Sequence, residues 1–267
     1  MKKLFSTTEL SDPRFESDYL RFITVKTNNL KGRGDICVFV PPVENAGHLP
    51  LVILLHGVYG SAWVWSQKAG VHITAMKMIQ NKEIPPMVIA MPSDGLWGDG
   101  SGYLAHNQRN FEQWIVEDVP NAIIENIPST SARSDLFISG LSMGGFGALR
   151  LGLKYSEKFK AVSAHSSITS ISQMPLFVEE SVENYRQRDE RENSVTGIIK
   201  KYGNDLPRIR FDCGSEDELL LHNRQLHSDL NKLMVDHIYE EFPGAHEWPY
   251  WQEHVKNSLR FFAEQIA

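Results

Sequence analysis

Short apolar runs alternate with helical patterns along most of this chain. Eight runs have the length and composition of buried strands, and they occupy residues 22–26, 36–40, 51–55, 87–91, 136–139, 161–164, 209–212 and 238–241. From the third run onward they alternate with amphipathic helical patterns at 73–80, 114–126, 143–155, 218–235 and 248–264. This series predicts an α/β fold: a mostly parallel sheet of about eight strands with helices on both faces and ligands at the carboxyl ends of the strands.

No repeat, low-complexity tract or Gly/Pro/Ser-rich linker divides the chain, so residues 1–267 are predicted to form a single domain. The segment 166–207 interrupts the regular alternation because it is polar and longer than a simple crossover requires. Two interpretations remain open for it. It is either a small lid or helical insertion, or a solvated helix on the surface.

Composition narrows the class of protein. The chain has 42% hydrophobic and 22% charged residues, which is typical of a globular protein, and its net charge of −6 with scattered Lys and Arg argues against a nucleic-acid partner. The N-terminus lacks the apolar core of a secretory signal and no run suits a membrane span, so we expect no membrane attachment. Cys37 and Cys213 are expected to be buried free thiols, as in a cytoplasmic protein, and a disulfide between them is the alternative.

The first chemical motif lies where an apolar run changes its period. Gly140-Leu141-Ser142-Met143-Gly144 follows a predicted strand and opens a predicted helix. Such a Gly-x-Ser-x-Gly turn is a nucleophile elbow, which lifts the serine hydroxyl to the helix N-terminus, where a developing anion is favoured. The same five-residue pattern arises by chance in loops, but the strand before it and the helix after it favour Ser142 as a nucleophile.

A serine nucleophile needs a base and an acid that orients the base. Asp217 follows the run 209–212 and precedes a helix, where a helix cap is the alternative role, and His246 follows the last predicted strand beyond a Pro-Gly turn. The order Ser, Asp, His is that of an α/β-hydrolase. Other acids and histidines fit these positions less well: Asp212, Glu216, His165, His222, His227, His237 and His254.

Acyl transfer also needs donors for the oxyanion. We predict the backbone amides of Met143, next to the nucleophile, and of Val58, which follows His56-Gly57 after the third predicted strand. A plain glycine turn is the alternative for that loop. In either case His56 is expected to shape the loop and not to transfer protons.

Aromatic side chains occur in the loops expected at the mouth of this site. Tyr59, Trp63, Trp97 and Tyr103 are candidate substrate contacts, Trp65 is a weaker one, and burial in the core is the alternative for all of them. The oxygen-rich segment 93–102 lacks the spacing of a calcium loop, so no metal is predicted.

Four segments, LLHGVYG, GLSMGGFGAL, CGSEDELL and PGAHEWPYW, together resemble the esterase D (putative esterase) family of α/β-hydrolases. This family includes tributyrin esterases, S-formylglutathione hydrolases, feruloyl and acetylxylan esterases, and mycolyltransferases. The chain looks most similar to the tributyrin esterases and to the feruloyl and acetylxylan esterases. Its sequence after His56-Gly57 departs from the S-formylglutathione hydrolase pattern, and segment 166–205 matches no part of the family pattern.

The resemblance implies that Ser142 is the nucleophile, Asp217 the orienting acid and His246 the general base, with the Val58 and Met143 amides as the oxyanion hole. It implies a serine carboxylesterase for short-chain acyl esters of small alcohols or sugars, without a cofactor. Three alternatives remain: an acyltransferase, a thioesterase like S-formylglutathione hydrolase, and a non-catalytic binding module on the same scaffold. The expected partner is a small-molecule ester, and a homodimer is a reasonable assumption for the assembly.

Overall fold

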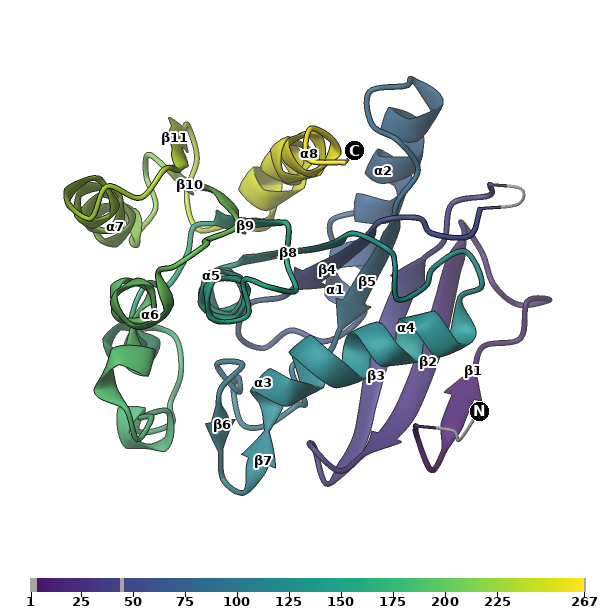
Figure 1. Cartoon of the computed structure of the whole chain (residues 1–267), viewed down its shortest axis with the longest axis horizontal. Coiled ribbons are helices and arrows are strands. Elements are labelled where there is room, and N and C mark those ends of the chain that lie inside the picture. The colour runs from purple at the N-terminus through teal and green to yellow at the C-terminus, as the bar shows by residue number, and fades with distance from the viewer. Residues whose placement is uncertain (1–3, 44–45, 267) are drawn as a thin grey trace.

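The computed structural model describes residues 4–43 and 46–266, and within them one nine-stranded sheet runs through the molecule in the order β1-β2-β3-β5-β4-β8-β9-β10-β11 (Figure 1). The pairs β1-β2, β2-β3 and β3-β5 are antiparallel, and all pairs from β5 to β11 are parallel. The strands are β1 Thr8–Leu10, β2 Leu20–Thr27, β3 Gly32–Phe39, β4 Leu51–Leu55, β5 Val88–Pro92, β8 Leu136–Leu141, β9 Ala161–His165, β10 Arg208–Gly214 and β11 Ile238–Phe242.

All eight predicted strands are present, and the sheet gains one strand that the pattern did not predict. Strand β1 has only three residues, all at least partly exposed, so it carries no apolar signal. A separate two-stranded ribbon, β6 Ala105–His106 and β7 Arg109–Asn110, was also not predicted because each of its strands has only two residues.

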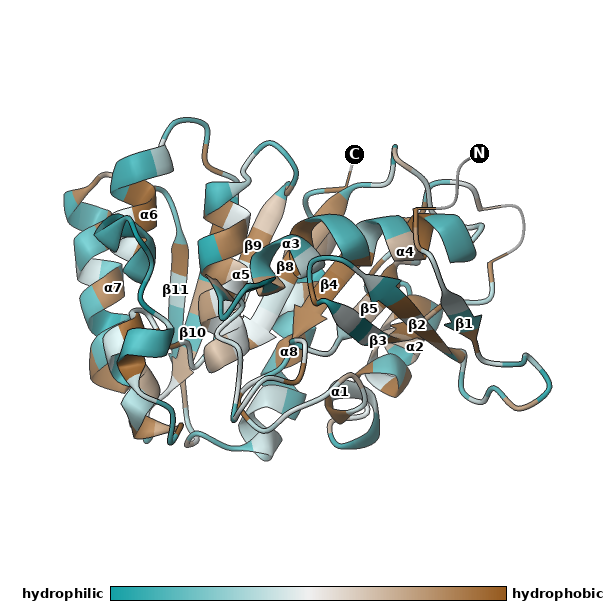
Figure 2. Cartoon of the chain, turned by 90° about the horizontal axis from the view of Figure 1, so that it is seen from below, coloured by the Kyte–Doolittle hydropathy of each residue, from teal (hydrophilic) through white to brown (hydrophobic). Residues whose placement is uncertain are grey.

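Helices cover both faces of the sheet, as the alternation predicted (Figures 1 and 2). Successive residues of a strand point to opposite faces, and β4 shows this directly: Ile53 packs into one core cluster and Val52 into the other. The cluster on one face takes in α4 Val119–Asn126, α5 Met143–Lys154, α6 Val195–Tyr202 and α7 Leu220–Lys232. The cluster on the other takes in α1 Val64–Gln67, α2 Val71–Gln80 and α8 Trp248–Ala263.

Most predicted helix limits hold to within two residues. The predicted helix 114–126 begins as a π-helical turn, η1 Trp114–Asp118, which follows the short α3 Phe111–Gln113 and continues into α4. The predicted helix 218–235 is shorter than expected, because the turn that holds Asp217 occupies the residues before α7 begins at Leu220.

Segment 166–207 is not a solvated helix. It contains three 3-10 turns and α6, and its Met174 and Tyr185 side chains are fully buried. The turns are η2 Ile171–Leu176, η3 Val182–Asn184 and η4 Glu190–Asn193. We call 166–207 the insertion.

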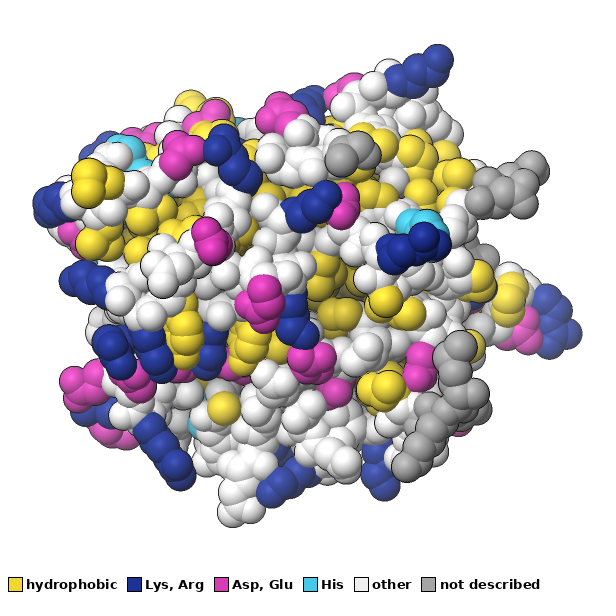
Figure 3. Space-filling view, in the orientation of Figure 1, with side chains coloured by type: hydrophobic (Ala, Val, Ile, Leu, Met, Phe, Trp, Pro, Cys, Tyr) yellow, Lys and Arg dark blue, Asp and Glu magenta, His cyan; other side chains and the backbone are white. Residues whose placement is uncertain are grey.

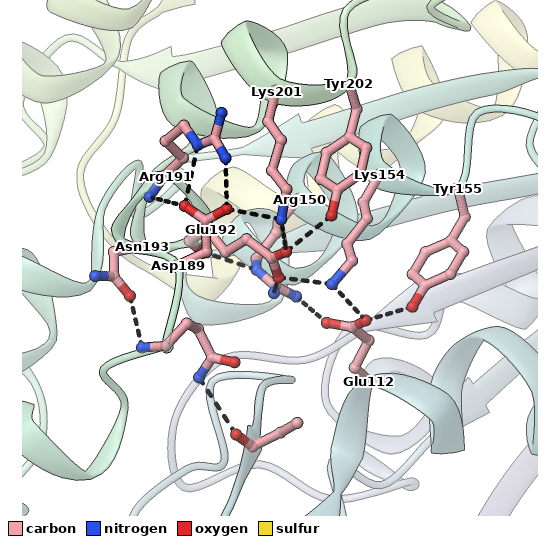
Figure 4. Close-up of polar contacts among 12 residues, drawn as sticks. Glu112, Arg150, Lys154, Tyr155, Asp189, Arg191, Glu192, Asn193, Lys201 and Tyr202 are labelled. Atoms are coloured by element: carbon pink, nitrogen blue, oxygen red, sulfur yellow. Dashed lines mark hydrogen bonds and ion pairs between the residues drawn. The ribbon is translucent and has the colours of Figure 1, made fainter.

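A buried ionic network fastens the insertion to α5 (Figure 4). Arg150 on α5 has no exposed side-chain area, and its guanidinium contacts Glu112 of α3 and, at 2.8 Å, Glu192 of the insertion. Lys154 bridges the same two carboxylates at 2.9 and 2.6 Å, and Lys201 of α6 reaches Glu192 at 2.5 Å. Because each buried charge has opposite charges beside it, the cost of removing these groups from water is offset.

On the face shown in Figure 3, basic and acidic side chains are interspersed and do not gather into a patch of one sign. Cys37 and Cys213 are buried free thiols, and burial raises the pKa of both. In the described ranges, none of the helices is long and apolar enough to cross a membrane.

Candidate active site

Ser142 occupies the sharp turn between β8 and α5. Its backbone has φ 54° and ψ −120°, a conformation that side-chain-bearing residues rarely adopt. The flanking glycines are required by space: a Cβ on Gly140 would lie 2.3 Å from the Gly144 carbonyl oxygen, and one on Gly144 would lie 2.5 Å from the carbonyl oxygens of Leu55 and His56. The strand end, the turn and the helix start therefore close against β4 only with glycine at both positions.

The structure brings the three predicted side chains together. His246 Nε2 lies 2.9 Å from Ser142 Oγ, and His246 Nδ1 lies 3.0 and 3.1 Å from the two carboxylate oxygens of Asp217. Each residue follows the carboxyl end of a parallel strand: Ser142 follows β8, Asp217 follows β10 and His246 follows β11. Parallel strands place these ends at one edge of the sheet, so residues far apart in the chain meet there.

Asp217 is the acid of this arrangement. Its side chain is fully buried, which by itself would raise its pKa, but the hydrogen bond and charge interaction with His246 and the Leu219 N–H at 2.8 Å lower the pKa overall. Glu216, the neighbouring alternative, is exposed. Asp217 thus has features of both roles that the sequence allowed, the helix cap and the orienting acid. Its carboxylate accepts a local backbone hydrogen bond and also faces the imidazole.

Five of the competing residues are engaged elsewhere. His165 and Asp212 pair with each other, with His165 Nδ1 2.9 Å from the Asp212 carboxylate, and both are fully buried. His227 Nδ1 lies 2.8 Å from His237 Nε2, and the His254 ring stacks on Phe242.

The loop after β4 is held by side chains that lie in the core. Tyr103 donates a hydrogen bond to the His56 carbonyl at 2.9 Å, and the indole N–H of Trp65 donates to the Leu55 carbonyl at 2.9 Å. His56 accepts the Asp94 N–H at its Nε2 and faces the Gly57 carbonyl with Nδ1, so both ring nitrogens serve the loop, as expected. This loop carries Val58 toward the elbow.

Within the described residues, the amides of Val58 and Met143 donate to no protein acceptor. Both amides are therefore available as the oxyanion-hole donors that the sequence predicts. The side chain of Met143 is fully buried, and its sulfur accepts the Gly102 N–H at 3.4 Å, which ties the elbow to the loop after β5.

The aromatic candidates divide into exposed and buried residues. Tyr59 and Trp63 are 69% and 50% exposed in the loop that carries Val58. Tyr103 is fully buried, so the expectation that it contacts substrate is wrong, and Trp65 is likewise a core residue. Trp97 is partly buried against the rings of His106 and Tyr185, at centroid distances of 4.5 and 5.8 Å.

Two aromatic residues at the site were not predicted. The ring of Phe177, in the insertion, stacks on His246 with centroids 5.0 Å apart, and the ring of Trp251, on α8, meets His246 edge to face at 5.0 Å. The Tyr59 hydroxyl donates to the Phe177 carbonyl at 2.7 Å, which joins the oxyanion loop to the insertion. A sequence signal existed for Trp251, which stands five residues after His246, but Phe177 lies in a segment without periodicity.

Comparison with known proteins agrees with this geometry. Residues 27–262 match the family model described as "Putative esterase". The chain belongs to this esterase family. An acetyl esterase from Caldicellulosiruptor saccharolyticus is 31% identical to this esterase over 237 residues, covering 81% of this chain and 84% of the relative. An S-formylglutathione hydrolase from Mus musculus is 26% identical over 214 residues, covering 74% of each protein.

Solved structures establish the fold of this esterase. A ferulic acid esterase superposes with a TM-score of 0.80 at 23% identity, covering 98% of this chain and 99% of that one. An S-formylglutathione hydrolase from Agrobacterium tumefaciens gives a TM-score of 0.77 at 19% identity, with the same coverage. The sheet, its flanking helices and these neighbours together define an α/β-hydrolase fold, and the enzyme is a carboxylic ester hydrolase.

Proposed function

We propose that this esterase hydrolyses short-chain acyl esters of small alcohols or sugars through an acyl-enzyme on Ser142. The observation that supports it most is the hydrogen-bonded series Ser142 Oγ, His246, Asp217, with distances of 2.9 and 3.0 Å, built on an elbow whose serine has positive φ. A nucleophile, a base in contact with it and an acid orienting the base are the complete set for serine catalysis.

In the proposed cycle, His246 accepts the Ser142 proton as the oxygen attacks the ester carbonyl. The tetrahedral oxyanion is stabilised by the amides of Val58 and Met143, and His246 then gives the proton to the departing alcohol. Water repeats the sequence: His246 accepts its proton, the oxygen attacks the acyl carbon, and Ser142 leaves with the proton returned. Asp217 stays ionised throughout, which agrees with the direction of its pKa shift.

The short acyl group is supported by the acetyl esterase relative at 31% identity. The rings of Phe177 and Trp251 against His246 supply apolar surface beside the reacting atoms, and the exposed Tyr59 and Trp63 are proposed to meet the substrate at the mouth. Trp97 is likewise proposed to contact the substrate.

A second candidate function is thioester hydrolysis of S-formylglutathione. The matches to S-formylglutathione hydrolases from Mus musculus, Bos taurus and Rattus norvegicus, at 25 to 26% identity, favour it. Acyl transfer to an acceptor alcohol would use the same triad. We also propose that the protein is cytoplasmic, which its free Cys37 and Cys213 suggest, and that it forms a homodimer.

The test is to measure kcat/KM of the wild-type enzyme on p-nitrophenyl esters from acetate to octanoate and, in parallel, on S-formylglutathione. We expect kcat/KM to fall for p-nitrophenyl esters longer than butyrate. We also expect kcat/KM to be at least tenfold lower for S-formylglutathione than for p-nitrophenyl acetate, and a tenfold difference corresponds to about 1.4 kcal/mol in transition-state binding. The reverse order would replace the ester proposal with the thioesterase one. Product partitioning with added methanol separates hydrolysis from acyl transfer.

A further inference from the structure

A second serine-histidine-aspartate arrangement lies inside the protein. His165 Nδ1 is 2.9 Å from the Asp212 carboxylate, and His165 Nε2 is 2.7 Å from Ser258 Oγ. The three residues come from β9, β10 and α8, and none is more than 1% exposed. Because no ester can reach Ser258, the arrangement is not a second active site.

The carboxylate at its centre is fully satisfied. Asp212 accepts hydrogen bonds from the Tyr250 hydroxyl at 2.8 Å and from Arg210 Nη1 at 2.7 Å, in addition to its contact with His165. Burial alone would raise the pKa of Asp212, but His165, Arg210 and Tyr250 together hold it at about 2. A fully satisfied buried network of this kind is rigid, since breaking any bond leaves a polar group unpaired in a low dielectric.

The network touches the nucleophile through the backbone. The carbonyl of His165 accepts the Ser142 N–H at 3.0 Å, and the carbonyl of Asp212 accepts the Ser166 N–H at 2.8 Å. The chain at His165 therefore contacts the elbow directly, while its side chain is held by Asp212 and Ser258.

The network touches the catalytic base through Tyr250. A Cβ on Gly244, which has φ +134°, would lie 2.8 Å from the Tyr250 ring, so this ring packs directly on the turn that precedes His246. The carbonyl of the same Gly244 accepts the Glu216 N–H at 2.9 Å, next to Asp217. Fixing the Tyr250 ring thus fixes the turns of both the base and the acid.

We propose that Asp212, His165, Ser258 and Tyr250 form a positioning network that holds Ser142 and His246 in hydrogen-bonding register. The proposal rests on the proposed function. Its residues touch no substrate, and they act on catalysis through the His165 carbonyl and through the contact between Tyr250 and Gly244.

The test is Tyr250→Phe, which removes only the hydroxyl on Asp212 and keeps the ring against Gly244. The matched control is Tyr239→Phe, which removes a tyrosine hydroxyl that donates to a carboxylate, Glu241, at 2.9 Å on β11. Steady-state kinetics on p-nitrophenyl acetate, labelling of Ser142 by a fluorophosphonate and Tm are measured for both. We expect Tyr250→Phe to lower kcat and the labelling rate about tenfold with KM within twofold, because small misplacements of catalytic groups are costly.

Tyr239→Phe should leave kcat and the labelling rate unchanged. Ser258→Ala, at the other end of His165, should repeat the kcat loss, and the double variant should lose less than the product of the single losses, as coupled residues do. A Tm decrease with kcat and labelling rate unchanged in both single variants would overturn the proposal. Failure of the proposed function is distinguishable, because it would appear in the wild-type enzyme itself, as a lack of p-nitrophenyl acetate hydrolysis or of label on Ser142, and would not depend on Tyr250 or Ser258.

Discussion

Phe177 lies face to face with His246, with ring centroids 5.0 Å apart and ring planes 23° apart. The insertion therefore supplies one face of the catalytic imidazole. We expect Phe177→Ala to lower kcat on p-nitrophenyl acetate about tenfold, because the His246 imidazole loses a packing partner that fixes its orientation.

The control for Phe177 is its neighbour Leu176, which is 56% exposed. Leu176→Ala should leave kcat within twofold of the wild-type value. Equal kinetics for the two variants would show that stacking on His246 contributes nothing to catalysis.

Glu192→Gln tests whether the ionic network fastens the insertion. Burial would raise the pKa of Glu192, but hydrogen bonds from Lys154, Lys201 and Tyr202 lower it from 4.5 to about 2. Loss of the carboxylate removes one of the two acidic partners of the buried Arg150 and of Lys154, so we expect the free energy of unfolding to fall by about 3 kcal/mol at pH 7. The exposed Glu157→Gln is the control, with an expected change below about 0.5 kcal/mol.

The same network has a predictable pH dependence. A carboxyl group whose pKa is lowered on folding stabilises the protein above its unfolded pKa and loses that contribution as pH falls toward its folded pKa. The stability difference between wild type and Glu192→Gln should therefore be constant above pH 4.5 and shrink between pH 4.5 and 2. Denaturant titrations across this range measure it, and a difference that grows on acidification would refute the network's role.

Gly144→Ala tests the space at the elbow. Its Cβ would lie 2.5 Å from two backbone carbonyl oxygens, and backbone cannot move aside as a flexible side chain can. We expect a loss of about 1–3 kcal/mol in unfolding free energy, together with most of the activity. Gly32→Ala, whose Cβ would meet nothing closer than 3.7 Å, should be neutral, and a neutral Gly144→Ala would contradict the described geometry.

Asp217→Asn and Glu216→Gln compare the two neighbouring acids. Asp217 is buried and contacts His246, whereas Glu216 is exposed. We therefore expect Asp217→Asn to lower kcat about 10³- to 10⁴-fold and Glu216→Gln to leave kcat within twofold of the wild-type value. A small loss in Asp217→Asn that becomes large only in the double variant would show that Glu216 substitutes for it.

The sheet and the three triad positions could be predicted because their signals are local. Five residues specify the elbow at Ser142, and Asp217 and His246 each follow an apolar run at the carboxyl end of a strand. Parallel topology then brings the three together without any further information.

The surroundings of the triad depend on contacts that the sequence pattern does not encode. The sequence predicts Tyr103 in a loop at the mouth. In the structure, Asp94 accepts the N–H groups of Leu96 and Ser101 in this loop, and Tyr103 lies in the core. Phe177 lies against His246 in a segment that is held to α5 by the ion pairs of Glu192 and to the loop after β4 by the Tyr59 hydroxyl. Such placements come from long-range side-chain packing, which periodicity does not report.

The most direct test of the account is p-nitrophenyl acetate hydrolysis by the wild-type enzyme and by Ser142→Ala, with fluorophosphonate labelling located by peptide mass spectrometry. We expect the wild-type enzyme to hydrolyse the ester and to carry the label on Ser142. The variant should have less than about 10⁻³ of the wild-type activity and should carry no label. Undiminished hydrolysis by Ser142→Ala, or a label on another residue, would contradict the assignment of Ser142 as the nucleophile.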